Sequence, residues 1–584
     1  MKKLILSIFP FVIFCTILFI GFEFLNVEQH PVVINENHSV QGINFLTKDV
    51  LSSKTSGEIK TVDLFKYSSK PVNAAKLNGF VKSAVSLTLT KKNLENFYRN
   101  PVENLTFRIP SSDNSYIELE LIRSNPFSNS AQFSTITSNG KQNLFPDKKD
   151  FAIFYKGYVK GDEKSIATIS VTKDEIIGIV SVKEGNYNLV QINELKNNGT
   201  LDYLYYNDAD LLVKNPFKCR VNDEGNKFVN NSPSLKNEMM HIETPTAGRT
   251  DTLWVYFETD YKLFQDKGSS NINVLNYVAA IFNEVQAIYS QILGIRMGIS
   301  GVAIWTQPDV YLNFSDSYNI LTTFGSRYKD NFYGNFAHLL STRNNGSLGG
   351  IAWIKVLCRQ YNSADSSGRY GFSNIINNYS PYPTYSWTIE VITHELGHNY
   401  GSRHTHACVW KISGPGGPYG ALDSCYTAEG GCFSQTQPNY GGTIMSYCHL
   451  NGEISFYKGF GSAPGDSIRR YYDSAFCLTR YVSSLFPTNH LLKQNYPNPF
   501  NPGTTIEFDI AGSSIVSLIV YDISGKEIGE LVSNQVYSKG TFTKYFNPAV
   551  FNLSSGIYFY RLVAKDIENT GDVFTEVKKM ILIK

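Results

Sequence analysis

The chain has 584 residues, of which 42% are apolar and 18% are charged. This length exceeds what one hydrophobic core accommodates, so we expect several domains, and the apolar content excludes a chain that is disordered throughout. The 53 Lys and Arg residues nearly balance the 51 Asp and Glu residues, and no long run of like charges occurs. We therefore expect no nucleic-acid partner and no anionic membrane surface as a partner.

The N-terminus has the pattern of an export signal. Lys2 and Lys3 precede an uncharged stretch over residues 4–22. We expect a signal peptide over residues 1–26 and a protein that leaves the cytoplasm. The apolar stretch is longer than most signal cores and lacks a clear small-x-small cleavage site, so an uncleaved membrane anchor is the alternative.

The next part of the chain alternates short apolar segments with polar turns, for example over residues 116–121 and 165–171. A period of two predicts β-strands, so we expect a β-rich leader over residues 27–213. A polar stretch rich in Asn, Ser, Pro and Lys follows over residues 214–249. It predicts an exposed linker that a protease can reach.

Strand and helix patterns are mixed over residues 250–482. An apolar run at 252–257 predicts a strand, and apolar residues recur at helical spacing over 271–293. A second apolar run at 350–354 precedes a predicted helix over 387–400. We therefore expect an α/β domain here.

The tail, residues 490–584, opens with a turn-rich stretch at 495–502 that contains three prolines and is incompatible with a helix. Gly, Asn and Ser turns then separate four strand patterns. They lie at residues 505–508, 516–521, 556–562 and 579–582. This spacing predicts a small β-sandwich.

Three histidines lie close together at His394, His398 and His404. Residues four apart on a helix share a face, so the first two can direct their imidazoles at one point. Gly401 allows the chain to leave the helix and bring His404 back to that point. Three nitrogen ligands leave one tetrahedral position for water, which is typical of a catalytic zinc.

Glu395 follows the first of these histidines and lies on an adjacent helix face. We expect it to take the proton of a zinc-bound water during attack on a peptide carbonyl, and then to pass a proton to the leaving amine. A lone His-Glu-x-x-His also occurs by chance on ordinary helices. The added glycine and third histidine at this spacing favour the catalytic interpretation.

With these residues the chain resembles the metzincins, and within them the reprolysin or adamalysin-like peptidases, whose motif is His-Glu-x-x-His-x-x-Gly-x-x-His followed by a methionine turn. The turn is matched at residues 442–447. The resemblance implies one catalytic zinc, a twisted mixed sheet with the active-site helix, and Met445 as an apolar floor beneath the metal. Analogy with the family would also allow a structural calcium, but the sequence shows no clear loop of oxygen ligands for one.

The same resemblance implies that Gly350, Ile351, Ala352 and Trp353 form the edge strand that pairs with an extended protein or peptide substrate. The chain departs from the family after the third histidine, where reprolysins commonly have Asp. Here Thr405 and His406 follow, so the expected anchoring carboxylate is missing. His406 is the alternative third ligand, but the spacing favours His404.

Six cysteines fall within one stretch of this exported chain, which favours disulfide bonds. They are Cys358, Cys408, Cys425, Cys432, Cys448 and Cys477. Family analogy joins Cys358 to Cys477. The other four permit three pairings, of which we favour Cys408 with Cys448 and Cys425 with Cys432.

Residues 154–159 and 165–168 are similar to the reprolysin propeptide, which implies a latent proenzyme. Cys219 lies far upstream of the other cysteines, at the start of the linker. Its thiolate can fill the open fourth position on zinc, an arrangement called a cysteine switch. The alternative is a buried or accidental free thiol.

The tail resembles the C-terminal sorting domain of the bacterial type IX secretion system, through its motifs at residues 494–502, 521–525, 556–558 and 579–580. The resemblance implies export by the outer-membrane secretion machinery of a two-membrane bacterium, to the medium or the cell surface. A carbohydrate- or protein-binding sandwich is the alternative.

These expectations combine into a multidomain fold, with an α/β metzincin-type domain between a β-rich prodomain and an Ig-like β-sandwich. They describe a secreted, monomeric zinc endopeptidase made as a latent proenzyme. Two rival interpretations are a noncatalytic adhesin on a dead protease fold and a cell-surface structural protein. The presence of Glu395 argues against the adhesin.

Overall fold

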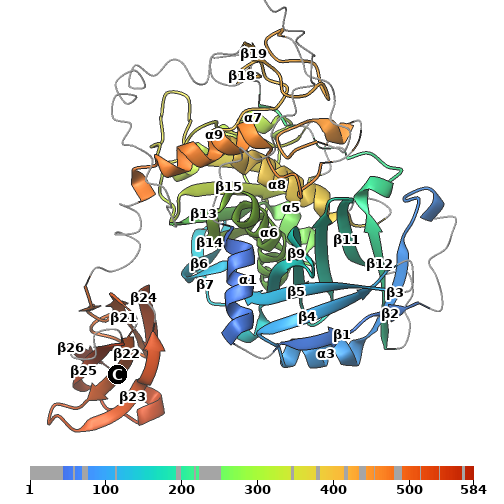
Figure 1. Cartoon of the computed structure of the whole chain (residues 1–584). Coiled ribbons are helices and arrows are strands. Elements are labelled where there is room, and N and C mark those ends of the chain that lie inside the picture. The colour runs from blue at the N-terminus through green and yellow to red at the C-terminus, as the bar shows by residue number, and fades with distance from the viewer. Residues whose placement is uncertain are drawn as a thin grey trace, which may run out of the picture.

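The computed structural model describes residues 44–583 with gaps (Figure 1). The gaps fall at residues 57–58, 69–76, 112–114, 193–198, 216, 218, 222–250, 344–347, 376–381, 413–417, 433–441, 451, 453, 479–488, 513, 538–539 and 568–572. The predicted signal peptide and most of the predicted linker therefore lie outside the described residues. Within the described part, no helix combines the length and the apolar character needed to cross a bilayer.

The leader contains the β-strands that its alternating pattern predicts. They form a ten-stranded sheet in which all neighbours are antiparallel except β1 and β4. In spatial order the strands are β1 (Lys60–Asp63), β4 (Asn104–Pro110), β5 (Tyr116–Ser124), β8 (Ile153–Val159), β9 (Asp162–Val171), β10 (Ile176–Val182), β11 (Gly185–Ile192), β12 (Thr200–Asn207), β3 (Val85–Thr90) and β2 (Lys66–Tyr67). Helices α1 (Phe45–Ser56) and α3 (Lys91–Arg99) accompany this sheet.

A second sheet of seven strands forms the centre of the domain at residues 250–482, here called the central domain. Its spatial order is β16 (Ile351–Ala352), β17 (Tyr370–Asn374), β15 (Phe336–Ser341), β13 (Thr252–Thr259), β14 (Arg296–Trp305), β6 (Phe127–Thr137) and β7 (Gly140–Leu144). Strands β6 and β7 come from the leader, and β6 pairs in parallel with β14. The sheet therefore crosses the boundary that we predicted at residue 213.

Helix α6 (Asn271–Leu293) has the bounds that the sequence predicts, with Ser270 as N-cap and Gly294 in the left-handed conformation after its end. It packs against β14 of the central domain and against β8 and β9 of the leader (Figure 1). Because it is covered from both sides, nearly all its residues are buried. The leader and the central domain consequently share one continuous hydrophobic core.

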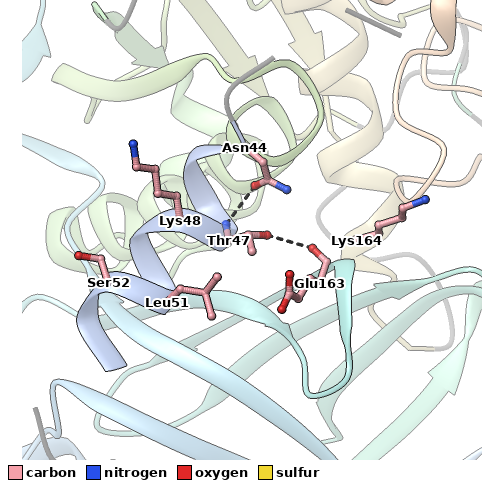
Figure 2. Close-up of a pocket in the computed structure, with 7 residues that line it drawn as sticks. All are labelled: Asn44, Thr47, Lys48, Leu51, Ser52, Glu163 and Lys164. Carbon is pink, nitrogen blue, oxygen red and sulfur yellow. Dashed lines mark hydrogen bonds between the residues drawn. The ribbon is translucent and has the colours of Figure 1, made fainter. Parts of the chain in front are cut away.

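Polar contacts also join the leader to α6. Figure 2 shows Thr47 of α1 between Asn44 and Glu163, with its hydroxyl donating to the Glu163 carbonyl at 3.0 Å. The amide of Gln291 on α6 donates to the same carbonyl. Three segments that are distant in sequence thus meet at one main-chain oxygen.

The disulfide pairing agrees with the sequence prediction at one bond and contradicts it at two. Cys358 is joined to Cys477, as family analogy implied. The other bonds are Cys408–Cys432 and Cys425–Cys448, so the predicted pairs Cys408–Cys448 and Cys425–Cys432 are wrong. The reason is that Glu429 pairs alongside Ala407, which brings Cys432 next to Cys408.

The tail consists of two antiparallel sheets around one apolar core. One sheet has the order β20 (Leu491–Leu492), β21 (Thr504–Ile510) and β24 (Gly540–Phe546). The other has the order β23 (Glu527–Tyr537), β22 (Ser514–Tyr521), β25 (Gly556–Asp566) and β26 (Val573–Leu582). The four strand patterns identified in the tail lie in β21, β22, β25 and β26.

Glu284 on α6 should make the free energy of unfolding depend on pH. Its carboxylate is buried and accepts a hydrogen bond from Thr168 of the leader, and burial raises the pKa of Glu284 from 4.5 to about 8. A raised carboxyl pKa means that the folded chain holds a proton which the unfolded chain releases. The free energy of unfolding should therefore fall between pH 4.5 and pH 8, by up to about 1.4 kcal/mol per pH unit.

Glu284→Gln should flatten this pH dependence and raise the thermal midpoint at pH 8, because an amide needs no proton to remain neutral. The measurement is thermal unfolding at pH 5 and pH 8, with the exposed Glu184→Gln as matched control. An identical pH slope in the parent and in Glu284→Gln would contradict the assignment.

Candidate metal centre

Helix α8 (Tyr385–Asn399) carries the first two of the predicted zinc ligands, and both are fully buried. The helix ends at a turn where Gly401 has φ +94°, a conformation that favours glycine. This turn returns the chain so that His398 Nε2 and His404 Nε2 lie 3.2 Å apart. The ligand atoms of His394, His398, His404 and Cys219 all lie within 4.8 Å of one another.

The opposite nitrogen of each ring faces an oxygen acceptor. The Nδ1 of His394 lies 2.7 Å from the Ile444 carbonyl, and that of His398 lies 2.9 Å from the Ser402 carbonyl. Because Nδ1–H donates there, Nε2 remains as the lone-pair nitrogen directed at the common point. Burial lowers the pKa of His394 well below its usual range, which favours the neutral ring that a metal requires.

The third ring is held by a side chain that sequence reasoning missed. His404 Nδ1 lies 3.3 Å from Glu429 Oε2, so Glu429 provides the anchoring carboxylate that we expected to be missing after His404. The Cys408–Cys432 disulfide ties the loop of Glu429 to the segment that follows His404. No spacing rule identifies Glu429, because it lies 25 positions after His404 in the sequence.

His406 does not join the three-histidine group. Its ring stacks on that of His404 with centroids 4.8 Å apart, and its Nε2 lies 3.4 Å from Glu429 Oε1. The described residues thus bring His404, not His406, together with the two histidines of the helix.

These donors fit a zinc ion. Three imidazoles, each with Nδ1 held from behind, are a typical zinc ligand set. His394 Nε2 is buried and makes no hydrogen bond within the described structure. A buried lone pair left without a partner is costly, and a bound cation would satisfy it.

Glu395 is fully buried beside these rings, on the face of α8 that approaches Gly350. A Cβ on residue 350 would lie 2.0 Å from Glu395 Oε1, so only glycine lets the edge of the sheet pass this carboxylate. Burial raises the pKa of Glu395 to about 8. A dication bound beside Glu395 would lower that pKa again by favouring the carboxylate.

Met445 lies beneath α8, where it is completely buried. A Cβ on Gly397 would lie 2.6 Å from the Met445 sulfur, so this glycine lets the helix rest closely on the methionine. The Met445 carbonyl also accepts a hydrogen bond from Thr405 N, next to His404. The methionine turn therefore supports both segments that carry the three histidines.

The predicted edge segment contacts the leader. Of its residues, Ile351 and Ala352 form β16, which pairs antiparallel with β17, and Trp353 is buried. Gly350 forms a parallel bridge with Cys219, and Arg220 N donates to the Gly350 carbonyl at 2.8 Å. The backbone of the leader at Cys219 therefore runs parallel to the backbone of the edge segment at Gly350.

The thiol of Cys219 reaches the histidine group. Its sulfur lies 3.5 Å from His398 Nε2, and the Tyr447 hydroxyl donates to its carbonyl at 2.9 Å. Burial raises the pKa of the Cys219 thiol to about 12, and a bound metal would have the opposite effect because it stabilises the thiolate.

Residues 249–456 match the family model described as metallo-peptidase family M12, and residues 494–578 match that of a secretion system C-terminal sorting domain. Disintegrin and metalloproteinase domain-containing protein 19 of Mus musculus is 23% identical over 311 residues, which cover 51% of this chain and 30% of that protein. Protein 9 of the same series from Homo sapiens is 22% identical over 284 residues, which cover 47% of this chain and 32% of that protein.

Among solved structures, mature mirolysin of Tannerella forsythia in complex with a cleaved peptide is similar at 11% identity and a TM-score of 0.22, covering 40% of this chain and 98% of that one. A score this low carries no weight for the fold. The chain spans about a third of the length of the curated relatives named above.

The matched segment includes the three buried histidines, Glu395 and the methionine turn, and the sorting-domain match covers most of the two-sheet tail. The chain therefore contains a reprolysin-type metallopeptidase domain of family M12, followed by a secretion system C-terminal sorting domain.

Proposed function

We propose that the chain is a secreted zinc-dependent endopeptidase made as a latent proenzyme. The observation that carries this proposal is the convergence of His394, His398 and His404 on one point, with each ring held by an acceptor behind it. Three imidazole ligands that leave a fourth position open are typical of a catalytic zinc rather than a structural one.

Zinc bound by these rings would polarise the carbonyl of a peptide bond and stabilise the charge that develops on its oxygen. Glu395 accepts a proton from the attacking water and delivers one to the departing amine. The edge at residues 350–353 holds an extended polypeptide through main-chain hydrogen bonds. Because Gly350 has no side chain, that polypeptide can lie close to Glu395.

The leader is the inhibitor of this site in our proposal. Cys219 provides a sulfur ligand for the fourth position, and its proximity to His398 supports this role. The leader segment also occupies the edge that a substrate needs. Removal of the leader would expose both the fourth zinc position and the edge at residues 350–353 to a substrate.

We assign the tail to export through the type IX machinery in the outer membrane of a two-membrane bacterium. The sorting-domain match supports this export route, and the two packed sheets support an Ig-like sandwich. The enzyme would act as a monomer on proteins outside the cell. The rival adhesin would not need Glu395, which this chain retains.

Glu395→Gln should lower kcat/KM for peptide hydrolysis by at least about 100-fold, because the amide cannot take the proton of the attacking water. The zinc content should remain at one ion per chain. The measurement combines metal analysis with a peptide digest of the processed protein. A noncatalytic adhesin would show no hydrolysis in either protein, and a structural protein would bind no stoichiometric zinc.

Cys219→Ser should make the unprocessed chain active, with a hydrolysis rate at least about tenfold above that of the parent, because a hydroxyl is a weaker zinc ligand than a thiolate. The measurement is cleavage of a peptide substrate before any processing is visible on a gel. The double variant Cys219→Ser with Glu395→Gln is the matched control and should not cleave the peptide. Unchanged latency would remove Cys219 from the inhibitory mechanism.

Glu429→Gln should weaken zinc binding by about 10- to 100-fold, because an uncharged amide holds the imidazole of His404 less firmly. Competition with a chelator measures this affinity, and Glu527→Gln, on an exposed residue of the tail, is the control. Equal zinc affinity in both variants would show that the Glu429 carboxylate does not position the ligand.

A further inference from the structure

The carboxylate that holds the third zinc ligand also contacts a second histidine. The rings of His404 and His406 are stacked, with centroids 4.8 Å apart and an angle of 9° between their planes. Glu429 divides its two oxygens between them. Oε2 lies 3.3 Å from His404 Nδ1, and Oε1 lies 3.4 Å from His406 Nε2. Each ring therefore faces one oxygen of the same side chain.

These three side chains are close enough to hold a second metal ion, because their ligand atoms lie within 4.8 Å of one another. The directions of the rings argue against such an ion. An imidazole binds a metal through a lone pair that lies in the ring plane, and the rings of His394 and His404 are inclined to that of His398 by 80° and 83°, so their planes intersect. The nearly parallel planes of His404 and His406 do not meet at a nearby point. A carboxylate, which offers a separate oxygen to each ring, fits this arrangement better than one cation does.

His406 has no other polar partner that would explain its position. It is completely buried, and neither of its ring nitrogens makes a hydrogen bond to another described residue. Tyr447 and Tyr426 pack against its ring, with centroids 4.5 and 5.3 Å away, which restricts rotation of the ring. The 3.4 Å contact with Glu429 is longer than an ideal N–H···O bond. Because a buried N–H without an acceptor is costly, Glu429 Oε1 is the acceptor that satisfies Nε2–H.

The main chain holds Glu429 to the same segment. Its N–H donates to the His406 carbonyl at 3.0 Å, and its carbonyl accepts a hydrogen bond from Cys408 N at 2.9 Å. With the backbone fixed on both sides, the freedom that remains to Glu429 is that of its side-chain torsions. A hydrogen bond from His406 to Oε1 restricts these torsions and keeps Oε2 at His404.

We propose that His406 is a positioning residue of the zinc site. Its Nε2–H donates to Glu429 Oε1, which keeps Oε2 against Nδ1 of His404 and so directs the Nε2 of that ligand at the metal. In this role His406 neither binds zinc nor contacts the substrate. The inference rests on the proposed zinc peptidase function and adds a residue to its metal site.

His406→Phe preserves a flat ring for stacking on His404 but has no N–H to donate. We expect it to lower the zinc affinity of the full-length chain, measured by competition with a chelator, by about tenfold. His406→Gln should recover most of this loss, because its amide N–H reaches about as far as the Nε2–H of histidine. His490→Phe, the same exchange in the tail, is the matched control and should bind zinc like the parent.

The shorter amide in His406→Asn does not reach Glu429 and should lose as much zinc affinity as His406→Phe. The comparison of Gln with Asn therefore still tests the proposal if the Phe variant fails to fold, which the thermal midpoint of each variant reveals. Equal zinc affinity in the folded Gln and Asn variants would overturn the proposal. So would a folded His406→Phe that binds zinc like the parent.

A double-mutant cycle tests whether His406 acts through Glu429. In a chain that carries Glu429→Ala, the further change His406→Phe should alter the zinc affinity by less than about twofold, because the carboxylate that transmits its effect is absent. A loss of the same size with and without Glu429 would show that His406 acts on the metal by another route, and would overturn the proposal.

Metal analysis of the same proteins separates this inference from the proposed function. One zinc per chain in the parent and in His406→Phe, held more weakly by the variant, supports both. Two ions in the parent and one in His406→Phe would make His406 a metal ligand, which overturns the inference and leaves the peptidase intact. A parent without stoichiometric zinc would overturn the proposed function and the inference together.

Discussion

The structure around the histidines depends on one constraint, which is that three imidazoles must direct the same nitrogen at one point. Each ring meets this constraint because its other nitrogen faces an oxygen, from Ile444, Ser402 or Glu429. These acceptors come from the methionine turn, the turn after α8 and a disulfide-tied loop. A buried ring without such an acceptor would be free to rotate or to change its tautomer.

Local patterns predicted much of this arrangement. The helical spacing of apolar residues predicted the bounds of α6, and the His-Glu-x-x-His spacing predicted that one face of α8 carries both His394 and His398. Gly401 marked the turn that follows, because its φ of +94° is accessible to glycine. Each of these features depends on residues within a few positions of one another, where helix geometry alone relates sequence to space.

Features that depend on distant segments were not predictable in this way. Glu429 reaches His404 across a long loop, and the pairing of Cys408 with Cys432 follows from the same loop. The addition of β6 and β7 to the central sheet was also missed. Their alternating pattern indicates a strand, but it does not say which sheet accepts the strand.

If the chain is the latent proenzyme that we propose, the parallel pairing of β6 with β14 has a consequence for its maturation. A cut within residues 222–250 breaks the covalent connection, but it leaves the main-chain hydrogen bonds between these strands and the buried contacts of α6 intact. Severing the chain and shedding the fragment are thus separate events. The second has a free-energy cost of its own, since it bares a strand edge and an apolar helix face to water.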